Sequence, residues 1–206
     1  LAGQPELGTA PSAALPAAAN GPAGASTLEV LYASQTGNGR GVAETLARRA
    51  AAAGLAVKAR SLDGFRVAGL AALKRAAFVI STHGDGDPPE EAVELFEYLE
   101  SGRAADLSGL EFCVLALGDR SYGKFCEAGR RLEALLRARG ARPFATRVDC
   151  DVDFAAAAQA WSDALIEHSA AREPANTVPV AAVPAAAMPA RLSVVTANHE
   201  WTRQRP

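Results

Sequence analysis

Short apolar runs that alternate with Ala-rich stretches of helical periodicity fill the middle of the chain. The runs predict five strands, at Leu28 to Ala33, Leu55 to Arg60, Ala76 to Ser81, Glu111 to Leu117 and about Arg142 to Val148. Helical patterns follow the strands, at residues 39–53, 67–75, 89–101, 124–139 and 153–168. Because strand and helix alternate strictly, we predict an α/β fold with a doubly wound parallel sheet and helices on both faces. Such sheets bind ligands at the carboxyl ends of their strands.

The two ends of the chain differ in composition from this middle part. Ala, Gly and Pro make up 17 of the first 27 residues, and Ala and Pro make up 13 of residues 170–190. Such segments cannot bury enough side chain to offset the entropy of ordering, so we expect disordered linkers at 1–27 and 170–190 around a folded domain at 28–169. Residues 191–206 regain apolar alternation and predict the truncated start of a following domain.

Charge and cysteine content exclude several classes of protein. The 21 Lys and Arg residues are balanced by 23 Asp and Glu residues, so no basic stripe is available for a nucleic acid. The apolar runs are shorter than the roughly 20 residues that span a bilayer, so we expect no membrane segment. Cys113, Cys126 and Cys150 form no CxxC pair, which is typical of a reduced, cytoplasmic chain.

The loop after the first strand runs directly into a helix. It consists of Ser34, Gln35, Thr36, Gly37, Asn38 and Gly39. Hydroxyls, an amide and backbone N–H groups at the positive end of a helix suit a phosphate dianion. The triphosphate pattern GxxxxGK[ST] is absent, and the dinucleotide pattern GxGxxG is a near miss because Val42 replaces its third glycine, although Asp63 could serve as its ribose-binding acid. Taken alone, the loop also fits a polar segment that only caps a helix.

Two further strand-end loops share this character. The loop after the third strand begins with Ser81, Thr82, His83 and Gly84. The loop after the fourth strand comprises Leu117, Gly118, Asp119, Arg120, Ser121, Tyr122, Gly123, Lys124, Phe125 and Cys126. Three loops rich in Gly and hydroxyl groups, one of them with a Tyr to lie against a flat ring, are typical of a site for a phosphorylated aromatic ligand such as FMN.

The motifs SQTGN, STHGDGDPPEEA and LGDRSYGKFCEAGRRLEALLRARGA resemble the FMN-binding flavodoxin-like domain of the diflavin reductases, in particular the flavoprotein (alpha) subunit of assimilatory NADPH-sulfite reductase. The resemblance covers nearly all of residues 28–168 and implies a flavodoxin-like, five-stranded sheet in the order 2-1-3-4-5. It implies that residues 34–39 hold the FMN phosphate, that residues 81–84 border the isoalloxazine ring, and that residues 117–126 cover its other side, with Tyr122 stacked on it.

The resemblance also implies a function and two points of difference. FMN would take electrons from an FAD domain reduced by NADPH, both bound by a missing C-terminal part, and pass them to a metal-centre acceptor such as the sulfite reductase haemoprotein. His83 stands where several relatives have a second aromatic residue, so the second face of the ring is expected to be less covered. Asp149 falls near an acidic position that the family keeps close to the flavin.

Two other functions stay open at this point. The module could deliver electrons to an upstream nitrate reductase or haem mono-oxygenase domain, or it could be a flavin-free flavodoxin-like interaction domain. A phospho-acceptor receiver domain is disfavoured, because such domains need an acidic cluster where this chain has Ser34, Gln35 and Thr36.

An acidic run separates the second loop from the fourth strand. It carries seven acids and no Lys or Arg, namely Asp85, Asp87, Glu90, Glu91, Glu94, Glu97 and Glu100. These acids fit either a solvated helix face, with negative charge at the helix start, or a docking surface for a basic electron-transfer partner.

Some single residues have plain structural interpretations. Asp119 could cap the next helix instead of orienting its loop, and His83 could be a solvated loop residue. We expect Phe154 and Trp161 in the core, and His168 in a favourable interaction with the dipole at the end of its helix.

Overall fold

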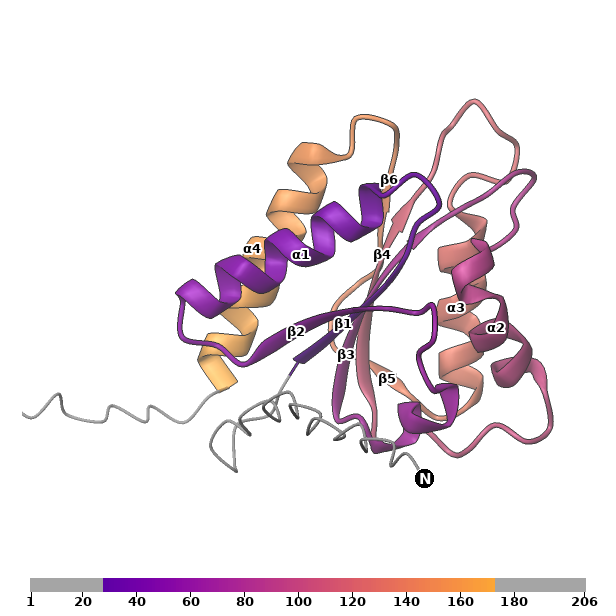
Figure 1. The fold of residues 1–206 in the computed structure, drawn as a ribbon, viewed down its shortest axis with the longest axis horizontal. Helices are drawn as coiled ribbons and strands as arrows, with labels where there is room; N and C mark the ends of the chain where they lie inside the picture. The colour runs from indigo at the N-terminus through magenta and orange to yellow at the C-terminus, as the bar shows by residue number, and fades with distance from the viewer. Residues whose placement is uncertain (1–27, 173–206) are drawn as a thin grey trace, which may run out of the picture. The chain divides into compact units, whose positions relative to one another are not determined.

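The computed structural model describes residues 28–172, and the remainder of the predicted linkers and the predicted domain start at 191–206 lie outside the described residues. The strands are β1 (Leu28–Ala33), β2 (Val57–Ser61), β3 (Arg75–Ser81), β4 (Glu111–Leu117), β5 (Arg142–Pro143) and β6 (Val148–Cys150). All of them pair in parallel, in the order β2-β1-β3-β4-β5, and β6 also pairs with β4 (Figure 1). The predicted fold class and strand order are confirmed.

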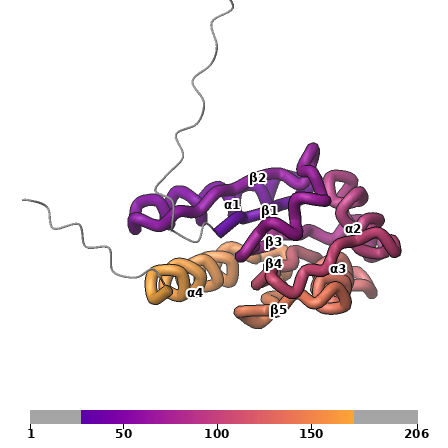
Figure 2. The backbone as a smooth tube through the Cα atoms, turned by 90° about the horizontal axis from the view of Figure 1, so that it is seen from below, coloured from indigo at the N-terminus to yellow at the C-terminus, as the bar shows by residue number. Residues whose placement is uncertain are grey.

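Residues 28–172 also form four α-helices and two 3-10 helices, of which the last α-helix follows the last strand and the others lie between strands. The α-helices are α1 (Asn38–Ala52), α2 (Val93–Glu100), α3 (Glu127–Ala138) and α4 (Ala155–Arg172), and the 3-10 helices are η1 (Val67–Ala72) and η2 (Glu90–Ala92). Figures 1 and 2 show α1 and α4 on one face of the sheet and α2 and α3 on the other. None of the helices within residues 28–172 has the length and apolar character needed to cross a membrane.

The central strands are buried on both faces, as expected for a parallel sheet covered by helices. Along β3, Phe78 and Ile80 pack toward α2 and α3, whereas Ala77 and Val79 pack toward α1 and α4, and all four are fully buried. The helices complete these layers with apolar stripes such as Ala43, Leu46 and Ala50 on α1. This rigid centre holds the strand ends, and therefore the loops that follow them, in fixed places.

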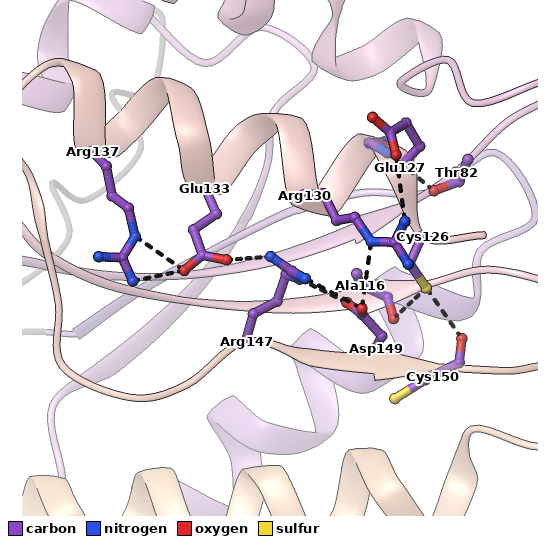
Figure 3. A network of polar contacts seen from close by, with 11 residues as sticks. Thr82, Ala116, Cys126, Glu127, Arg130, Glu133, Arg137, Arg147, Asp149 and Cys150 are labelled. Atoms are coloured by element: carbon purple, nitrogen blue, oxygen red, sulfur yellow. Dashed lines mark hydrogen bonds and ion pairs between the residues drawn. The ribbon is translucent and has the colours of Figure 1, made fainter. Parts of the chain in front are cut away.

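The predicted fifth strand is divided in two, which corrects the expectation of a continuous strand over residues 142–148. Its first part, β5, ends at Pro143, and the flanking Arg142 and Phe144 N–H groups donate to Leu110 O at 3.0 Å and to Phe112 O at 2.9 Å on the β4 side. Before β6 begins, the Arg147 guanidinium bonds Glu133 on α3 and, at 2.7 Å, Asp149 Oδ1 (Figure 3). The chain leaves the sheet edge after Phe144 and pairs with β4 again from Val148.

Three of the predicted helices also differ at their ends. The pattern at residues 67–75 forms only the 3-10 helix η1, because β3 already begins at Arg75. The pattern at 124–139 begins as a helix only at Glu127. Helix α4 begins at Ala155 and continues to Arg172, so the folded part extends three residues beyond the predicted boundary at 169.

His168 lies near the end of α4, where its ring stacks on Phe144 with the centroids 5.2 Å apart. Its Nε2 is buried and has no hydrogen-bond partner among the described residues. Burial lowers the pKa of His168, and the guanidinium groups of Arg75 and Arg172 lower that pKa further against the opposing effect of Glu111. The neutral ring is therefore favoured here, and the expected stabilisation of a cation by the helix dipole does not dominate.

This environment predicts a pH dependence of stability. Because the folded chain lowers the pKa of His168, the unfolded chain binds a proton there more readily. We expect the free energy of unfolding to fall as the pH drops through about 6.5, the ordinary histidine value, and the fall to end below the folded-state pKa. His168→Gln should flatten this part of the curve in urea unfolding series between about pH 5 and 8. An unchanged slope in the variant would show that another group causes the dependence.

Candidate functional site

The three predicted loops meet at the carboxyl ends of β1, β3 and β4 and line a cavity of about 430 Å³. This volume lies in the range of about 300 to 1,000 Å³ that is typical of small-molecule sites. The predicted site residues that line it are Gln35, Thr36, Asn38, Ser81, Thr82, His83, Gly84, Leu117, Gly118, Asp119, Tyr122, Lys124 and Cys126. Val152 and Phe154 complete the wall, although neither was predicted to belong to the site.

Ser34 is buried at the end of β1 and organises the first loop from within. Its backbone N–H donates to Glu91 Oε2 at 2.6 Å, and its Oγ accepts the Gly39 N–H at 2.9 Å. Within residues 28–172, the backbone N–H groups of Gln35, Thr36 and Asn38 have no acceptor. Three free donors therefore lie at the N-terminus of α1, where the helix dipole favours an anion.

Two glycines make this loop compact. Gly37 has a φ of 82°, the left-handed conformation that glycine adopts without strain, and it directly precedes α1. Gly39 is buried so closely against the loop that a Cβ there would lie 2.9 Å from the Cβ of Ser34. Ser34, Gly37 and Gly39 thus shape the loop and are not among the residues that line the cavity.

The second loop folds back on itself. His83 and Asp87 exchange two backbone hydrogen bonds, of 2.8 and 2.9 Å, which close a tight turn around Gly84. The Thr82 hydroxyl accepts the Ala128 N–H at 3.3 Å and so satisfies a donor in the first turn of α3. His83 and Gly84 are held exposed on the cavity wall by these contacts.

Asp119 orients the third loop. Its Oδ1 accepts the Ser121 N–H at 2.8 Å and the Ser121 hydroxyl at 2.5 Å. Both bonds lower the pKa of Asp119, the hydroxyl more than the N–H. Because α3 begins only at Glu127, Asp119 does not cap that helix, and its carboxylate instead fixes the turn of its own loop at Ser121.

Tyr122 is the most informative side chain of the third loop. It lines the cavity, yet the residue is 58% exposed, and it is one of three large hydrophobic residues in the described part of the chain that are exposed. Another of the three, Val152, is 67% exposed and lines the same cavity. These two residues give the cavity wall an apolar surface, against which a flat or apolar group can pack.

Four predicted residues of this loop do not line the cavity. Arg120 lies over the Phe125 ring, with its Cζ 5.0 Å from the ring centroid, and it pairs with Asp151 at 3.5 Å. These contacts use the two side chains within the protein. Ser121, which is hydrogen-bonded to Asp119, does not line the cavity either, and neither does Gly123.

Cys126 ends the loop in a strained backbone conformation. Its φ of 54° is rare for a residue other than glycine. Its Sγ is buried within 3.5 Å of Ala116 O and 3.6 Å of Cys150 O (Figure 3). Burial, and then the charge of Asp149, raise the pKa of Cys126 to about 12, so the thiol is protonated and packs as an apolar group.

Asp149 and Phe154 are placed differently from expectation. Asp149 does not line the cavity, because its carboxylate pairs with Arg147 at 2.7 Å and with Arg130 at 3.8 Å (Figure 3). Phe154 packs partly against the core, as predicted, but also forms cavity wall. Trp161 lies in the core, as predicted. The segment after β6 therefore forms a fourth side of the cavity, and its apolar residues Val152 and Phe154 are the sequence feature that marks it.

Comparison with known proteins identifies the family of the chain. A family model described as Flavodoxin matches residues 30–161, which include all three loops of the cavity. The chain belongs to the flavodoxin family. The flavodoxin of Streptococcus pneumonia TIGR4 aligns with a TM-score of 0.61 at 23% identity, over 70% of this chain and 98% of that one. Oxidised flavodoxin 1 of Bacillus cereus aligns with a TM-score of 0.56 at 19% identity, over 69% of this chain and 99% of that one. These two likenesses show the fold alone.

Curated relatives of this flavodoxin domain are larger proteins. It is 47% identical over 137 residues to the sulfite reductase (NADPH) flavoprotein alpha-component of Shewanella sp. (strain MR-7), covering 66% of this chain and 23% of that protein. The corresponding protein of Vibrio parahaemolyticus serotype O3:K6 is 43% identical over 159 residues, with coverages of 77% and 25%. The chain thus spans about a quarter of the length of these relatives, and the resemblance seen in the sequence motifs is confirmed.

Proposed function

We propose that this flavodoxin domain binds FMN in the cavity and relays electrons within a larger reductase. The observation that carries the proposal is the exposed Tyr122 ring on the wall of a cavity that is also lined by the loop with the free N–H donors. An aromatic face and a helix N-terminus together match a ligand with a flat ring and a phosphate. Neither group has another use within the described chain.

The residues divide into two sets. Thr36 and Asn38, with the Gln35 N–H, would hold the phosphate at the start of α1. Tyr122 would lie against the ring, and residues 81–84 would border its edge. Bound FMN supplies one- and two-electron transfer, while the protein binds it, orients it and excludes water. No general acid or base is needed for this function, which agrees with a site built mainly from backbone groups and one aromatic residue.

We place the electron donor and the electron acceptor outside this domain. The relatives are named as NADPH-dependent flavoproteins, and this chain matches about a quarter of their length. We assign FAD and NADPH to a reductase domain in the remaining part, and a metal-centre acceptor such as the sulfite reductase haemoprotein as the destination. The three cysteines are free and buried, which supports a cytoplasmic location.

The acidic run contributes a surface that fits a basic acceptor. Three of its acids have partners in the chain: Asp85 pairs with Lys124, Glu91 accepts the Ser34 N–H, and Glu100 pairs with Arg131. The other four are exposed and have no ion-pair partner within residues 28–172. We call these four the acidic surface: Asp87, Glu90, Glu94 and Glu97. It adjoins the cavity through the backbone pairing of Asp87 with His83.

A single experiment tests the relay and the surface together. The 206-residue chain is loaded with FMN, reduced with dithionite without oxygen, freed of excess reductant and mixed with cytochrome c, a basic haem protein. Two electrons from each reduced flavin should convert two ferric haems to ferrous haems, with release of the flavin protons to water. The rate should fall as salt rises, and Glu94→Gln should slow it about two- to threefold at low salt.

Glu167→Gln is the matched control, because Glu167 is an exposed helical glutamate on α4, outside the acidic surface. No reduction of the haem by the reduced chain would contradict the relay. Equal rates for Glu94→Gln and Glu167→Gln would contradict the acidic surface alone.

A further inference from the structure

Glu91 belongs to the acidic run in sequence but not to the acidic surface in space. It lies in η2, between the exposed Glu90 and the buried Ala92, and its side chain is half-buried. Its Oε2 accepts the backbone N–H of Ser34 at 2.6 Å, across 57 residues of sequence. A carboxylate acceptor makes this a charge-assisted bond, which is about twice as strong as a bond between neutral groups.

The fold explains why these two residues meet. β1 and β3 are neighbours in the sheet, with Ala33 opposite Ile80, so the loops that follow them leave the same edge side by side. The Ser81 hydroxyl links the two strand ends by donating to Ala33 O at 3.3 Å. In η2, the Ala92 N–H donates to Pro89 O at 2.8 Å and Ala92 is fully buried, which fixes the backbone beside Glu91.

The hydrogen bond to Glu91 fixes the backbone of Ser34 and thereby also the position of the Ser34 hydroxyl. A buried N–H such as that of Ser34 needs an acceptor, and Glu91 supplies it. With its backbone fixed, Ser34 places its Oγ 2.9 Å from the Gly39 N–H and so sets the path of the loop into α1. The donors of Thr36 and Asn38 lie on that path between the two fixed points.

We propose that Glu91 is a positioning residue for the phosphate-binding loop, one that acts through Ser34 and does not itself contact the ligand. The inference rests on the proposed FMN function. It assigns to Glu91 a role in the selection of a phosphorylated flavin over its unphosphorylated analogue. The neighbouring acids of the run have no such role.

Loss of the Glu91 charge and loss of its hydrogen bond to Ser34 are expected to change the FMN affinity in opposite directions. A carboxylate behind an anion site repels the phosphate, so loss of the charge alone would tighten FMN binding. Loss of the hydrogen bond releases Ser34 and weakens FMN binding. Glu91→Ala removes both, Glu91→Gln removes the charge but keeps an acceptor oxygen, and Glu91→Asp keeps the charge but is one methylene too short for the contact.

The test measures dissociation constants for FMN and riboflavin by quenching of flavin fluorescence in the 206-residue chain. We expect Glu91→Ala and Glu91→Asp to raise the Kd for FMN about tenfold and to leave the Kd for riboflavin within about twofold. Glu91→Gln should stay within about threefold of the parent for FMN. Glu90→Ala is the matched control, an exposed acid of the same 3-10 turn, and should change neither constant by more than about twofold.

The alternatives are separable. Unchanged or tighter FMN binding in Glu91→Asp and Glu91→Ala would overturn the proposal, as would an equal loss for both flavins, which indicates general damage. If Glu91→Ala does not fold, Glu91→Asp decides. Failure of the parent chain to bind either flavin would instead overturn the proposed function itself.

Discussion

Replacement of Tyr122 by alanine raises the Kd for FMN about 10- to 100-fold, the range expected when one aromatic platform is removed from a stacked ring. Tyr122 is 58% exposed, so removal of its ring exposes no core, and the thermal unfolding midpoint should stay unchanged. The measurement is a fluorescence titration with FMN, accompanied by visible spectra of the bound flavin.

Tyr122→Phe is the control for this prediction, because it keeps the aromatic face and removes only the hydroxyl. It should bind FMN within about twofold of the parent chain. If Tyr122→Ala binds FMN with the parent's affinity and spectrum, Tyr122 is not part of the flavin site, and the assignment of the cavity loses its main support.

Gly129→Ala destabilises the fold, although it adds a helix-favouring residue to α3. A Cβ at this position would lie 2.4 Å from the Cβ of Ala116 on β4, and neither of these atoms belongs to a flexible side chain. Helix α3 must therefore move away from the sheet. We expect a net loss of about 1–3 kcal/mol in the free energy of unfolding, despite the gain in helix propensity.

Gly41→Ala provides the opposite case within the same chain. Gly41 lies in α1 and a Cβ there would meet no atom within 4 Å, so this substitution should stabilise the fold by about 0.5–1 kcal/mol. Urea unfolding of the ligand-free chain measures both changes. A stability of Gly129→Ala equal to or above that of the parent would show that the close approach of α3 to β4 does not limit the size of residue 129.

The alternation of strand and helix patterns in the sequence predicts most of the fold. The strand boundaries that it predicts wrongly have identifiable physical causes. The start of β3 was placed one residue late because Arg75 reads as a surface residue, whereas its guanidinium is buried over the Phe144 ring, 4.5 Å from the centroid. Within the break of the fifth strand, Arg147 bonds Glu133, a partner that lies on helix α3. Periodicity within one segment contains no information about such partners.

The site was predictable at the level of loops but not of side chains. Glycines, hydroxyls and a strand-to-helix junction identify each loop, because those features are local. Whether a side chain faces the ligand depends on contacts across the fold, as for Phe125, which lies under Arg120. The same limit explains why Glu91 could not be told apart from Glu90 in the acidic run, and why Phe154 was assigned to the core alone.

The most direct test of the account is a titration of the 206-residue chain, first freed of any flavin, with FMN, followed by removal of free flavin and a visible spectrum of the protein. We expect a yellow protein with about one FMN per chain, as for one ligand in the described cavity, and bands shifted from those of free FMN. A protein that remains colourless after this treatment would contradict the electron-transfer function and would favour a flavin-free interaction domain.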